Sequence, residues 1–233
     1  MSLKVSQEVR DLLSDPTWTI NNLYRIIDKD AKDIPFKMNW AQKDMWERMH
    51  TRNICLKARQ LGSTTFWCVV ALNKALFQPN QRIGIISYNM QSAHDIFAKV
   101  LKHAVKTLPP KVRDLPQCQI VADSAREISF ANGSSIRVDT SMRGGTLSML
   151  LVTEFGKICA RYPKKAEEIL TGSINTVPKN ALCVIESTAE GASGMYFEMW
   201  KEAYKNINRT DLGILEWKPF FYPWYGHKTE YTL

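Results

Sequence analysis

The sequence has few cysteines, and their arrangement does not suit cross-linking or metal binding. Its 233 residues include five cysteines, an odd number that is scattered along the chain, with no Cys-x-x-Cys pair and no accompanying histidine. A disulfide framework or a structural zinc site requires such spacing. We therefore expect a fold held together by its hydrophobic core, as one large domain or a domain with a small appendage.

Long hydrophobic runs are also missing. The longest apolar stretches, such as the one at 148–152, have the length of a strand, far short of the roughly 20 residues that cross a bilayer. The first ten residues, MSLKVSQEVR, lack the apolar centre of a signal peptide. These absences predict a soluble intracellular protein that does not bind a membrane.

The chain carries a moderate excess of positive charge. Lys and Arg number 31 against 23 Asp and Glu, so the formal net charge is +8, while 45% of the residues are hydrophobic and 23% are charged. This usage excludes a disordered or fibrous chain. A positive balance is compatible with a polyanionic partner such as DNA, but by itself it does not establish one.

Hydrophobic spacing divides the chain into three parts. Residues 1–50 are predicted to form an N-terminal helical subdomain, because apolar residues recur every three to four positions from Val9 to Ile27, and a second helix is expected at 40–50 after the break at Pro35. Residues 51–217 are predicted to form the core. Residues 218–233 are predicted to be an aromatic-rich tail or linker.

Within the core, short apolar runs alternate with helical stretches. Strands are expected at 53–58, 82–87, 149–154, 181–187 and 212–217, and helices at 63–76, 91–105, 164–174 and 194–204. A hairpin is expected at 127–140 around Asn132-Gly133, since Asn-Gly accepts the positive φ of a tight turn. The pattern predicts an α/β fold with a mostly parallel sheet flanked by helices and a β-hairpin insertion.

The first core strand runs into a loop of the kind that binds phosphate. The P-loop pattern is G-x-x-x-x-G-K-[ST] between a strand and a helix. Gly62 and Thr64 occupy two of its defining positions, whereas Lys57 stands at the first glycine and Ser63 at the lysine. Backbone N–H groups at a helix N-terminus form an anion site whatever the side chains. The predicted nucleotide-binding residues are Lys57, Ala58, Arg59, Gln60, Leu61, Gly62, Ser63, Thr64 and Thr65.

A cation is still required against the β- and γ-phosphates. Lys57 and Arg59 are the candidates, and the sequence does not decide between them. A lysine at the strand end can fold back over the loop, so Lys57 is our first candidate. The alternative is a solvated pair on a loop that binds nothing.

Polar residues elsewhere fit the same kind of site. Gln42 precedes the loop at a distance where its amide can pair with an adenine edge, and the alternative is a glutamine on the surface of a helix. The apolar run 149–152 ends in Thr153-Glu154, like a Walker B strand in which Glu154 orients the attacking water and Thr153, in place of aspartate, bonds a metal-bound water.

A further strand ends in a polar turn, Glu186-Ser187-Thr188-Ala189-Glu190-Gly191. It lies at the carboxyl edge of the sheet, where open α/β sheets bind their ligands. Glu186 and Glu190 are the next candidates for positioning water if Glu154 does not.

Taken in order, these motifs resemble the ATPase domain of bacteriophage terminase large subunits, the motors that package viral DNA. The loop ARQLGSTT is similar to the family's ARQLGKTT-type loop, LLVTEFGK to its Walker B strand and ESTAEG to its coupling motif, with Ser187, Thr188 and Ala189 at the centre. The resemblance extends from Gln42 to the aromatic FFYPW near 220–224. Ser63 and Thr153 depart from the pattern, and the second departure weakens the case for magnesium.

The resemblance implies a P-loop NTPase fold of the ASCE or RecA-like class, with ATP and Mg²⁺ as cofactors and Thr64 as a direct metal ligand. It implies that Arg143, in a loop with Gly144 and Gly145, acts as an arginine finger on a neighbouring subunit. The alternative is a surface arginine that contacts DNA or solvent.

The resemblance also implies partners and a location. These are double-stranded DNA, a portal protein, a small terminase subunit and a homo-oligomeric ring that docks on a procapsid in the cytoplasm of the infected bacterial host, with a monomer possible in isolation. A nuclease domain follows the ATPase in this family, and we expect no nuclease activity from these 233 residues.

Two other functions remain open at the level of sequence. One is a helicase-like ATPase that remodels nucleic acid, since such proteins also place a glutamine before the P-loop. The other is a catalytically inactive DNA-binding module, in which Ser63 and Thr153 mark a lost site. Release of γ-phosphate by the purified chain separates these functions.

Overall fold

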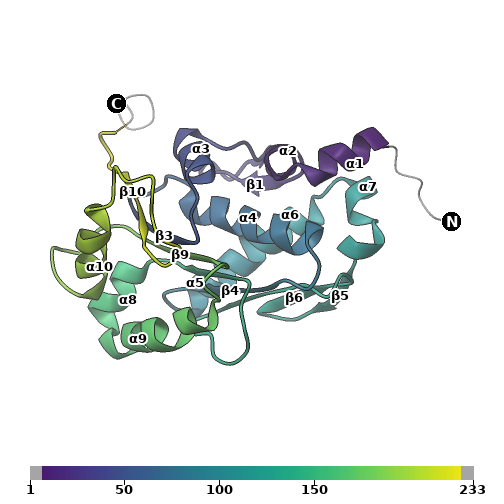
Figure 1. Cartoon of the computed structure of the whole chain (residues 1–233). Coiled ribbons are helices and arrows are strands. Elements are labelled where there is room, and N and C mark those ends of the chain that lie inside the picture. Colours follow the sequence, from purple (N-terminus) through teal and green to yellow (C-terminus); the bar gives the residue numbers. More distant parts are fainter. Residues whose placement is uncertain (1–6, 227–233) are drawn as a thin grey trace.

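A computed structural model describes residues 7–226 of the chain. Residues 1–6 of the predicted helical subdomain and 227–233 of the predicted tail lie outside the described residues. The described part is built on one mixed sheet with helices on both faces (Figure 1). No helix within 7–226 is long and apolar enough to cross a membrane.

The main sheet has the strand order β10-β3-β9-β8-β4-β7-β6-β5. Neighbouring strands are parallel from β10 to β7, and β6 and β5 then continue antiparallel at one edge. The strands are β3 (Arg52–Lys57), β4 (Arg82–Ile86), β5 (Ile120–Asp123), β6 (Glu127–Phe130), β7 (Ser135–Asp139), β8 (Met149–Val152), β9 (Leu182–Ser187) and β10 (Lys218–Tyr222). The predicted α/β fold with a mostly parallel sheet is confirmed.

One face of the sheet is covered by the N-terminal half of the chain (Figure 1). Its central element is the helix α4, which is apolar around most of its circumference and accordingly buried on nearly all sides. The helices from this half are α1 (Gln7–Ser14), α2 (Pro16–Asn22), α3 (Trp40–Glu47), α4 (Ser63–Phe77), α5 (Met90–Asp95), a π-helix (Ile96–Lys102), α6 (His103–Lys106), α7 (Pro110–Arg113) and a short 3₁₀ turn (Pro116–Cys118).

The opposite face is covered by helices from the C-terminal half, which enclose a second apolar cluster. These are α8 (Phe155–Arg161), α9 (Pro163–Glu168), a π-helix (Ile169–Ser173), a 3₁₀ turn (Ile174–Thr176) and α10 (Met195–Tyr204). Because both faces are covered, the inner strands are apolar on both sides, and all four residues of β8 are buried.

The N-terminal part is less helical than predicted. Ile26 and Ile27 lie in a small antiparallel hairpin, β1 (Arg25–Ile27) with β2 (Asp33–Pro35). The Asp28 carboxylate accepts bonds from the backbone N–H groups of Asp30 and Lys32 at 2.9 and 2.8 Å and so forms the turn. Such side-chain bonds compete with a helix.

The last strand is displaced from its predicted position. Residues 212–217 form a turn, in which the Gly213 N–H donates to the Glu216 carboxylate at 2.6 Å and Arg209 pairs with that same carboxylate. The strand is instead β10, where Phe220 and Tyr222 are buried. The sheet thus extends to Tyr222, past the boundary predicted for the core at 217.

Candidate nucleotide site

The carboxyl edge of the sheet carries the loop expected to bind phosphate. β3 ends at Lys57 and α4 begins at Ser63, so residues 58–62 form the connection, as predicted. Gln60 and Gly62 have positive φ angles of 60° and 72°. No side chain caps the N-terminus of α4. The first N–H groups of a helix lack partners within it, so this end of a 15-residue helix can receive an anion.

Two side chains of α3 and its N-cap hold the loop in place. Asn39 donates from Nδ2 to the Leu61 carbonyl at 3.1 Å, and Gln42 donates from Nε2 to the Gly62 carbonyl at 3.0 Å. A Cβ on Gly62 would lie 2.8 Å from Gln42 Nε2. Position 62 therefore requires glycine both for its φ angle and for the space beside Gln42.

These bonds give Gln42 a different use from the predicted one. Its side chain is only 4% exposed, and its Oε1 accepts from the Asn39 N–H at 3.0 Å. Contact with an adenine edge would require this amide to exchange one of its present bonds. Asn39 was not identified from the sequence, although an Asn that precedes a helix and a Gln three residues later form a recognisable capping box.

Lys57 is the last residue of β3, six residues before α4 begins. Side chains alternate along a strand, so Lys57 shares a face with Cys55, which is buried in the cluster beneath α4. Burial raises the pKa of the Cys55 thiol, the charge of Glu186 raises it further, and the positive charge of Lys57 opposes the rise. Lys57 is half-buried, whereas Arg59 is exposed. Of the two candidate cations, the structure places Lys57 on the α4 side of the sheet.

The first turn of α4 is bonded to the neighbouring strand β9. Ser63 and Thr64 both donate from their hydroxyls to the carboxylate of Glu186. Ser63 and Glu186 are 0% and 1% exposed, and Thr64 is half-buried. The sequence pointed to Glu186 only as a second choice for positioning water.

Glu154 lies at the end of β8, two strands from β3. It has φ 52° and ψ 38°, a left-handed conformation that is uncommon for a residue other than glycine. Such strain is found at functional sites. The Glu154 carboxylate is partly exposed and pairs with Lys157 at 3.3 Å. Lys157 also lies over the ring of Tyr88, 4.7 Å from its centroid.

Thr153 is placed differently from the expected metal contact. Its side chain is buried, and its hydroxyl donates to the Ile86 carbonyl of β4 at 3.3 Å. The hydroxyl is therefore bonded on the side of β8 that faces away from β9 and β3.

The predicted coupling motif joins two parts of the site. Ser187, the last residue of β9, accepts from the Gly156 N–H at 3.0 Å, and Gly156 lies two residues after Glu154. A Cβ on Gly156 would lie 2.8 Å from Ser187 Oγ. Tyr196 of α10 donates to the Cys55 carbonyl of β3 at 2.7 Å. Thr188 and Ala189 follow in the more exposed loop beyond the strand.

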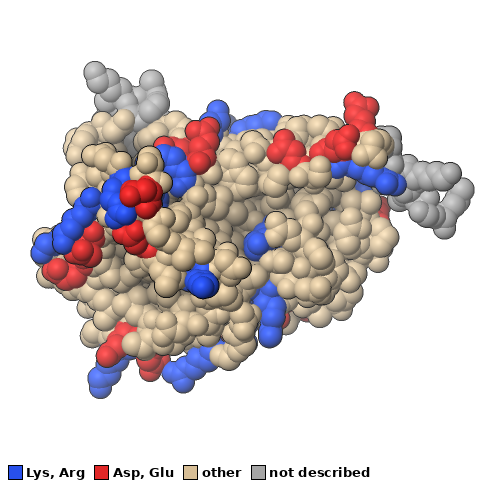
Figure 2. All heavy atoms as spheres, in the orientation of Figure 1, with Lys and Arg blue, Asp and Glu red and all other residues tan. Residues whose placement is uncertain are grey.

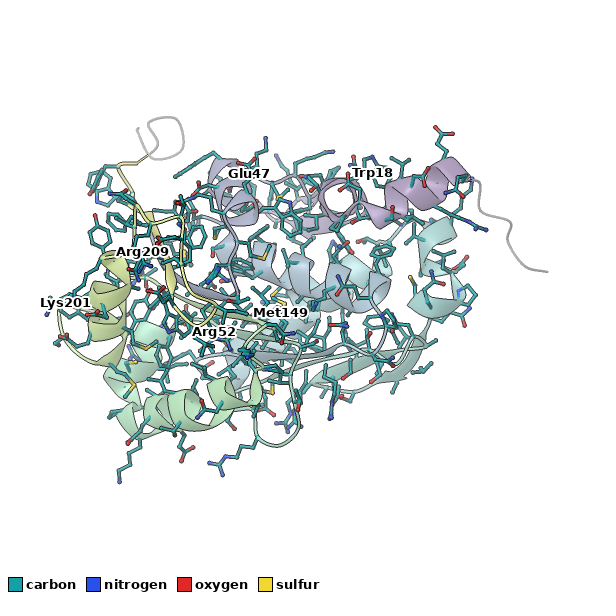
Figure 3. The ribbon with its side chains drawn as sticks, viewed as in Figure 1. Trp18, Glu47, Arg52, Met149, Lys201 and Arg209 are labelled. Atoms are coloured by element: carbon teal, nitrogen blue, oxygen red, sulfur yellow. The ribbon has the colours of Figure 1, made fainter. Side chains whose placement is uncertain are left out.

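Arg143 lies apart from these residues. β7, which precedes its loop, is four strands from β3, or about 19 Å at roughly 4.8 Å per strand. Arg143 is 76% exposed and pairs with Glu168 of α9 at 2.8 Å. The nearby Gly145 faces Arg82, the first residue of β4, so the loop runs back toward the amino edge of the sheet. Figure 3 labels two residues of that edge, Arg52 and Met149, which begin β3 and β8.

Comparison with known proteins identifies the fold. No family model matches the sequence, and no curated protein matches it. Among solved structures, the chain is similar to the large terminase ATPase domain of Thermus phage P74-26, with 18% identity, a TM-score of 0.58 and coverage of 80% of this chain and 81% of that one.

Two other similar structures come from larger proteins. The large terminase of bacteriophage HK97 has 14% identity and a TM-score of 0.68 over 90% of this chain and 43% of that one. The large terminase of another thermophilic bacteriophage, in complex with ADP, has 12% identity and a TM-score of 0.53, over 79% of this chain and 45% of that one. This chain thus spans less than half of each, and it has the P-loop fold of the phage large terminase ATPase domain.

Proposed function

We propose that this chain is the ATPase motor domain of a phage terminase large subunit, which couples Mg²⁺-dependent ATP hydrolysis to movement of double-stranded DNA into a procapsid. The observation that carries the proposal is the meeting of three features at one edge of the sheet. These are the uncapped N-terminus of α4, Lys57 at the end of β3 and Glu154 at the end of β8.

The phosphates of ATP bind at the start of α4 in this proposal. The N–H groups of the first turn and the positive end of the helix dipole attract them. Lys57 supplies the cation that position 63 lacks, because it lies on the α4 side of the sheet. The similar phage terminase structure in complex with ADP supports nucleotide binding by this fold.

The residues beside the loop fit Mg²⁺. This ion prefers oxygen ligands and is commonly bound by few protein groups together with substrate phosphates. Thr64 supplies a half-buried hydroxyl oxygen whose proton is donated to Glu186. When bound, Mg²⁺ neutralises charge that develops on the phosphates.

Glu154 orients the attacking water. Its partly exposed carboxylate lies at the carboxyl edge and pairs with Lys157 at 3.3 Å. A carboxylate can accept several hydrogen bonds at once, so Glu154 can hold a water as well as this lysine. The Ser187–Gly156 bond links the end of β9 to the helix that follows Glu154. In this proposal, a change at the γ-phosphate reaches the loop 188–194 from Glu154 through this bond between Gly156 and Ser187.

Arg143 acts on the ATP of a neighbouring subunit. Its loop runs back toward the amino edge of the sheet and it pairs with Glu168 of α9, whereas the phosphate-binding loop of its own subunit lies at the carboxyl edge. Its partner Glu168 is exposed, so the ion pair can be exchanged for a phosphate at modest cost. The proposal therefore includes a homo-oligomeric ring, in which each interface completes one site.

The remaining parts of the proposal concern DNA, assembly and location. The net charge of +8 favours a polyanion. On the face in Figure 2, however, basic and acidic side chains are interspersed, and the described residues of that face form no continuous basic patch. We propose docking on a portal protein, with a small terminase subunit, in the host cytoplasm.

The test is phosphate release from ATP by the purified chain over a range of protein concentrations, with and without double-stranded DNA. The proposal expects turnover that requires Mg²⁺, rises with protein concentration and is stimulated by DNA. Turnover with single-stranded nucleic acid alone would favour a helicase-like enzyme. Failure to bind ATP at any concentration would contradict the proposal.

A further inference from the structure

Glu186 is a buried carboxylate whose two bonding partners both belong to the first turn of α4, directly after the phosphate-binding loop. It lies one residue before the end of β9 and accepts from the hydroxyls of Ser63 and Thr64. A carboxylate without its proton can only accept hydrogen bonds. Two hydroxyl donors on one buried carboxylate thus fit the charged form and satisfy a group that would otherwise be costly to bury.

Glu186 lies on the strand next to the one that leads to position 153, where the Walker B pattern has an acidic residue and this chain has threonine. Glu186 is paired in register with Cys55 of β3 and faces α4. Counting along β8, where Met149 and Leu151 face that same cluster, Thr153 also faces α4, one strand farther from the loop. At position 153, where the Walker B pattern has a carboxylate, there is a hydroxyl bonded to β4. The carboxylate is found instead on the strand next to β3.

The two hydroxyl donors differ in whether a ligand can reach the lone pairs of their oxygen atoms. Each has a single proton, and once that proton is donated to Glu186 only oxygen lone pairs remain. Ser63 is fully buried, with Met45 Sδ at 4.0 Å from its oxygen. Thr64 is half-buried, so its lone pairs are the ones that a ligand can reach.

We propose that Glu186 is the positioning residue for the metal ion that accompanies the nucleotide, a proposal that rests on the ATPase function proposed above. Glu186 holds the proton of Thr64 and so presents the Thr64 oxygen to Mg²⁺. Its negative charge also favours a cation beside it. It performs from β9 the part that an acidic residue at position 153 would perform from β8.

The same arrangement accounts for serine at position 63. A lysine there would begin next to the buried Glu186 carboxylate and would pair with the oxygen that Ser63 now bonds, which would draw the charge of Glu186 away from Thr64. Ser63 adds a second bond to Glu186 without competing for its charge. The phosphate-binding cation is then provided from another position, at Lys57.

The experiment measures how much Mg²⁺ strengthens nucleotide binding. A fluorescent, non-hydrolysable ATP analogue is titrated into the full chain in the presence of Mg²⁺ and in the presence of EDTA, and the ratio of the two dissociation constants is the metal-dependent gain. The variants are Glu186→Gln, Thr64→Val and the double variant. Glu202→Gln, an exposed carboxylate on α10 that pairs with Lys205, is the matched control.

We expect Glu186→Gln to lower the metal-dependent gain at least tenfold, since outer partners of metal ligands commonly contribute 10- to 100-fold to metal affinity. Its affinity in EDTA should stay within about threefold of wild type, and Glu202→Gln should leave both values unchanged. Because Glu186 acts through Thr64, the double variant should be no worse than Thr64→Val.

Two results would overturn the inference. One is a wild-type metal-dependent gain in Glu186→Gln, and the other is an equal further loss when Glu186→Gln is added to Thr64→Val. Should Glu186→Gln fail to fold, Glu186→Asp tests the same point. Its carboxylate lies one methylene farther from Thr64, so it should also lower the metal-dependent gain. A wild-type chain that binds no nucleotide would instead refute the proposed function.

Discussion

Replacing Lys57 with alanine tests whether this residue substitutes for the P-loop lysine. Lys57 is the last residue of β3, half-buried and on the face of the sheet beneath α4. The substitution leaves the backbone bond from the Ala58 N–H to the Tyr222 carbonyl, 2.8 Å long, in place. We therefore expect the free energy of unfolding to change by no more than about 0.5 kcal/mol, as for most substitutions away from the core.

The expected loss of activity follows from the charge removed. Two unit charges about 4 Å apart interact by about 4 kcal/mol at the effective dielectric of roughly 20 that suits a partly exposed site. At about 1.4 kcal/mol per factor of ten, this corresponds to a loss in kcat/KM of about a thousandfold. Arg59→Ala should cost less than tenfold, because Arg59 is exposed on the loop.

The assay is steady-state phosphate release at saturating Mg²⁺ and protein concentration, with thermal unfolding measured on the same samples. Adding Ser63→Lys to Lys57→Ala should not restore activity, because a lysine at 63 would pair with Glu186. Turnover within threefold of wild type in a folded Lys57→Ala variant would refute the assignment. A greater loss in Arg59→Ala would move the role to Arg59.

Three further substitutions test other parts of the account. Glu154→Gln should bind ATP normally and lower hydrolysis by 10²-fold or more in phosphate-release assays, whereas normal hydrolysis would move the role to Glu190. Arg143→Ala should lower turnover in assembled protein by about 10³-fold, and mixing it with Glu154→Gln subunits should restore part of that turnover. Turnover that does not depend on protein concentration and is unchanged by Arg143→Ala would exclude a role in trans. Gly62→Ala should lower stability by about 1–3 kcal/mol in chemical unfolding, because φ is 72° and the new methyl meets Gln42; an unchanged unfolding midpoint would show that the loop relaxes.

The strands that are buried on both faces are among the parts of the fold that were predicted correctly. β8 is a continuous apolar run, and β3, β4 and β9 each contain a shorter one, at 54–56, 83–86 and 182–185; such runs are visible in a sequence because no polar alternation is permitted. The π-helical stretch Ile96–Lys102 lies within the predicted helix 91–105. Its apolar residues are spaced as in an α-helix, so the sequence did not distinguish the two kinds of helix. The hairpin at Ile26 and Ile27 was predicted as helix because two adjacent apolar residues also fit a helical face.

The loop was predictable from the sequence, but its partners were not. A strand followed by Gly62 and a helix is a local pattern, whereas the bond from Ser63 to Glu186 joins residues 123 positions apart. Only the register that pairs Cys55 with Glu186 brings them together. The same holds for Gln42, whose local capping pattern gave no sign that its amide also holds the Gly62 carbonyl.

The most direct test of the central claim is a crystal structure of the full chain with Mg²⁺ and a non-hydrolysable ATP analogue. The account predicts phosphates on the N–H groups of residues 59–65 at the start of α4. It also predicts Lys57 Nζ within hydrogen-bond distance of a phosphate oxygen and the metal on Thr64 Oγ1 with Glu186 still bonded to that hydroxyl. Nucleotide bound elsewhere on the chain, or at this loop with Lys57 turned away from the phosphates, would contradict the account.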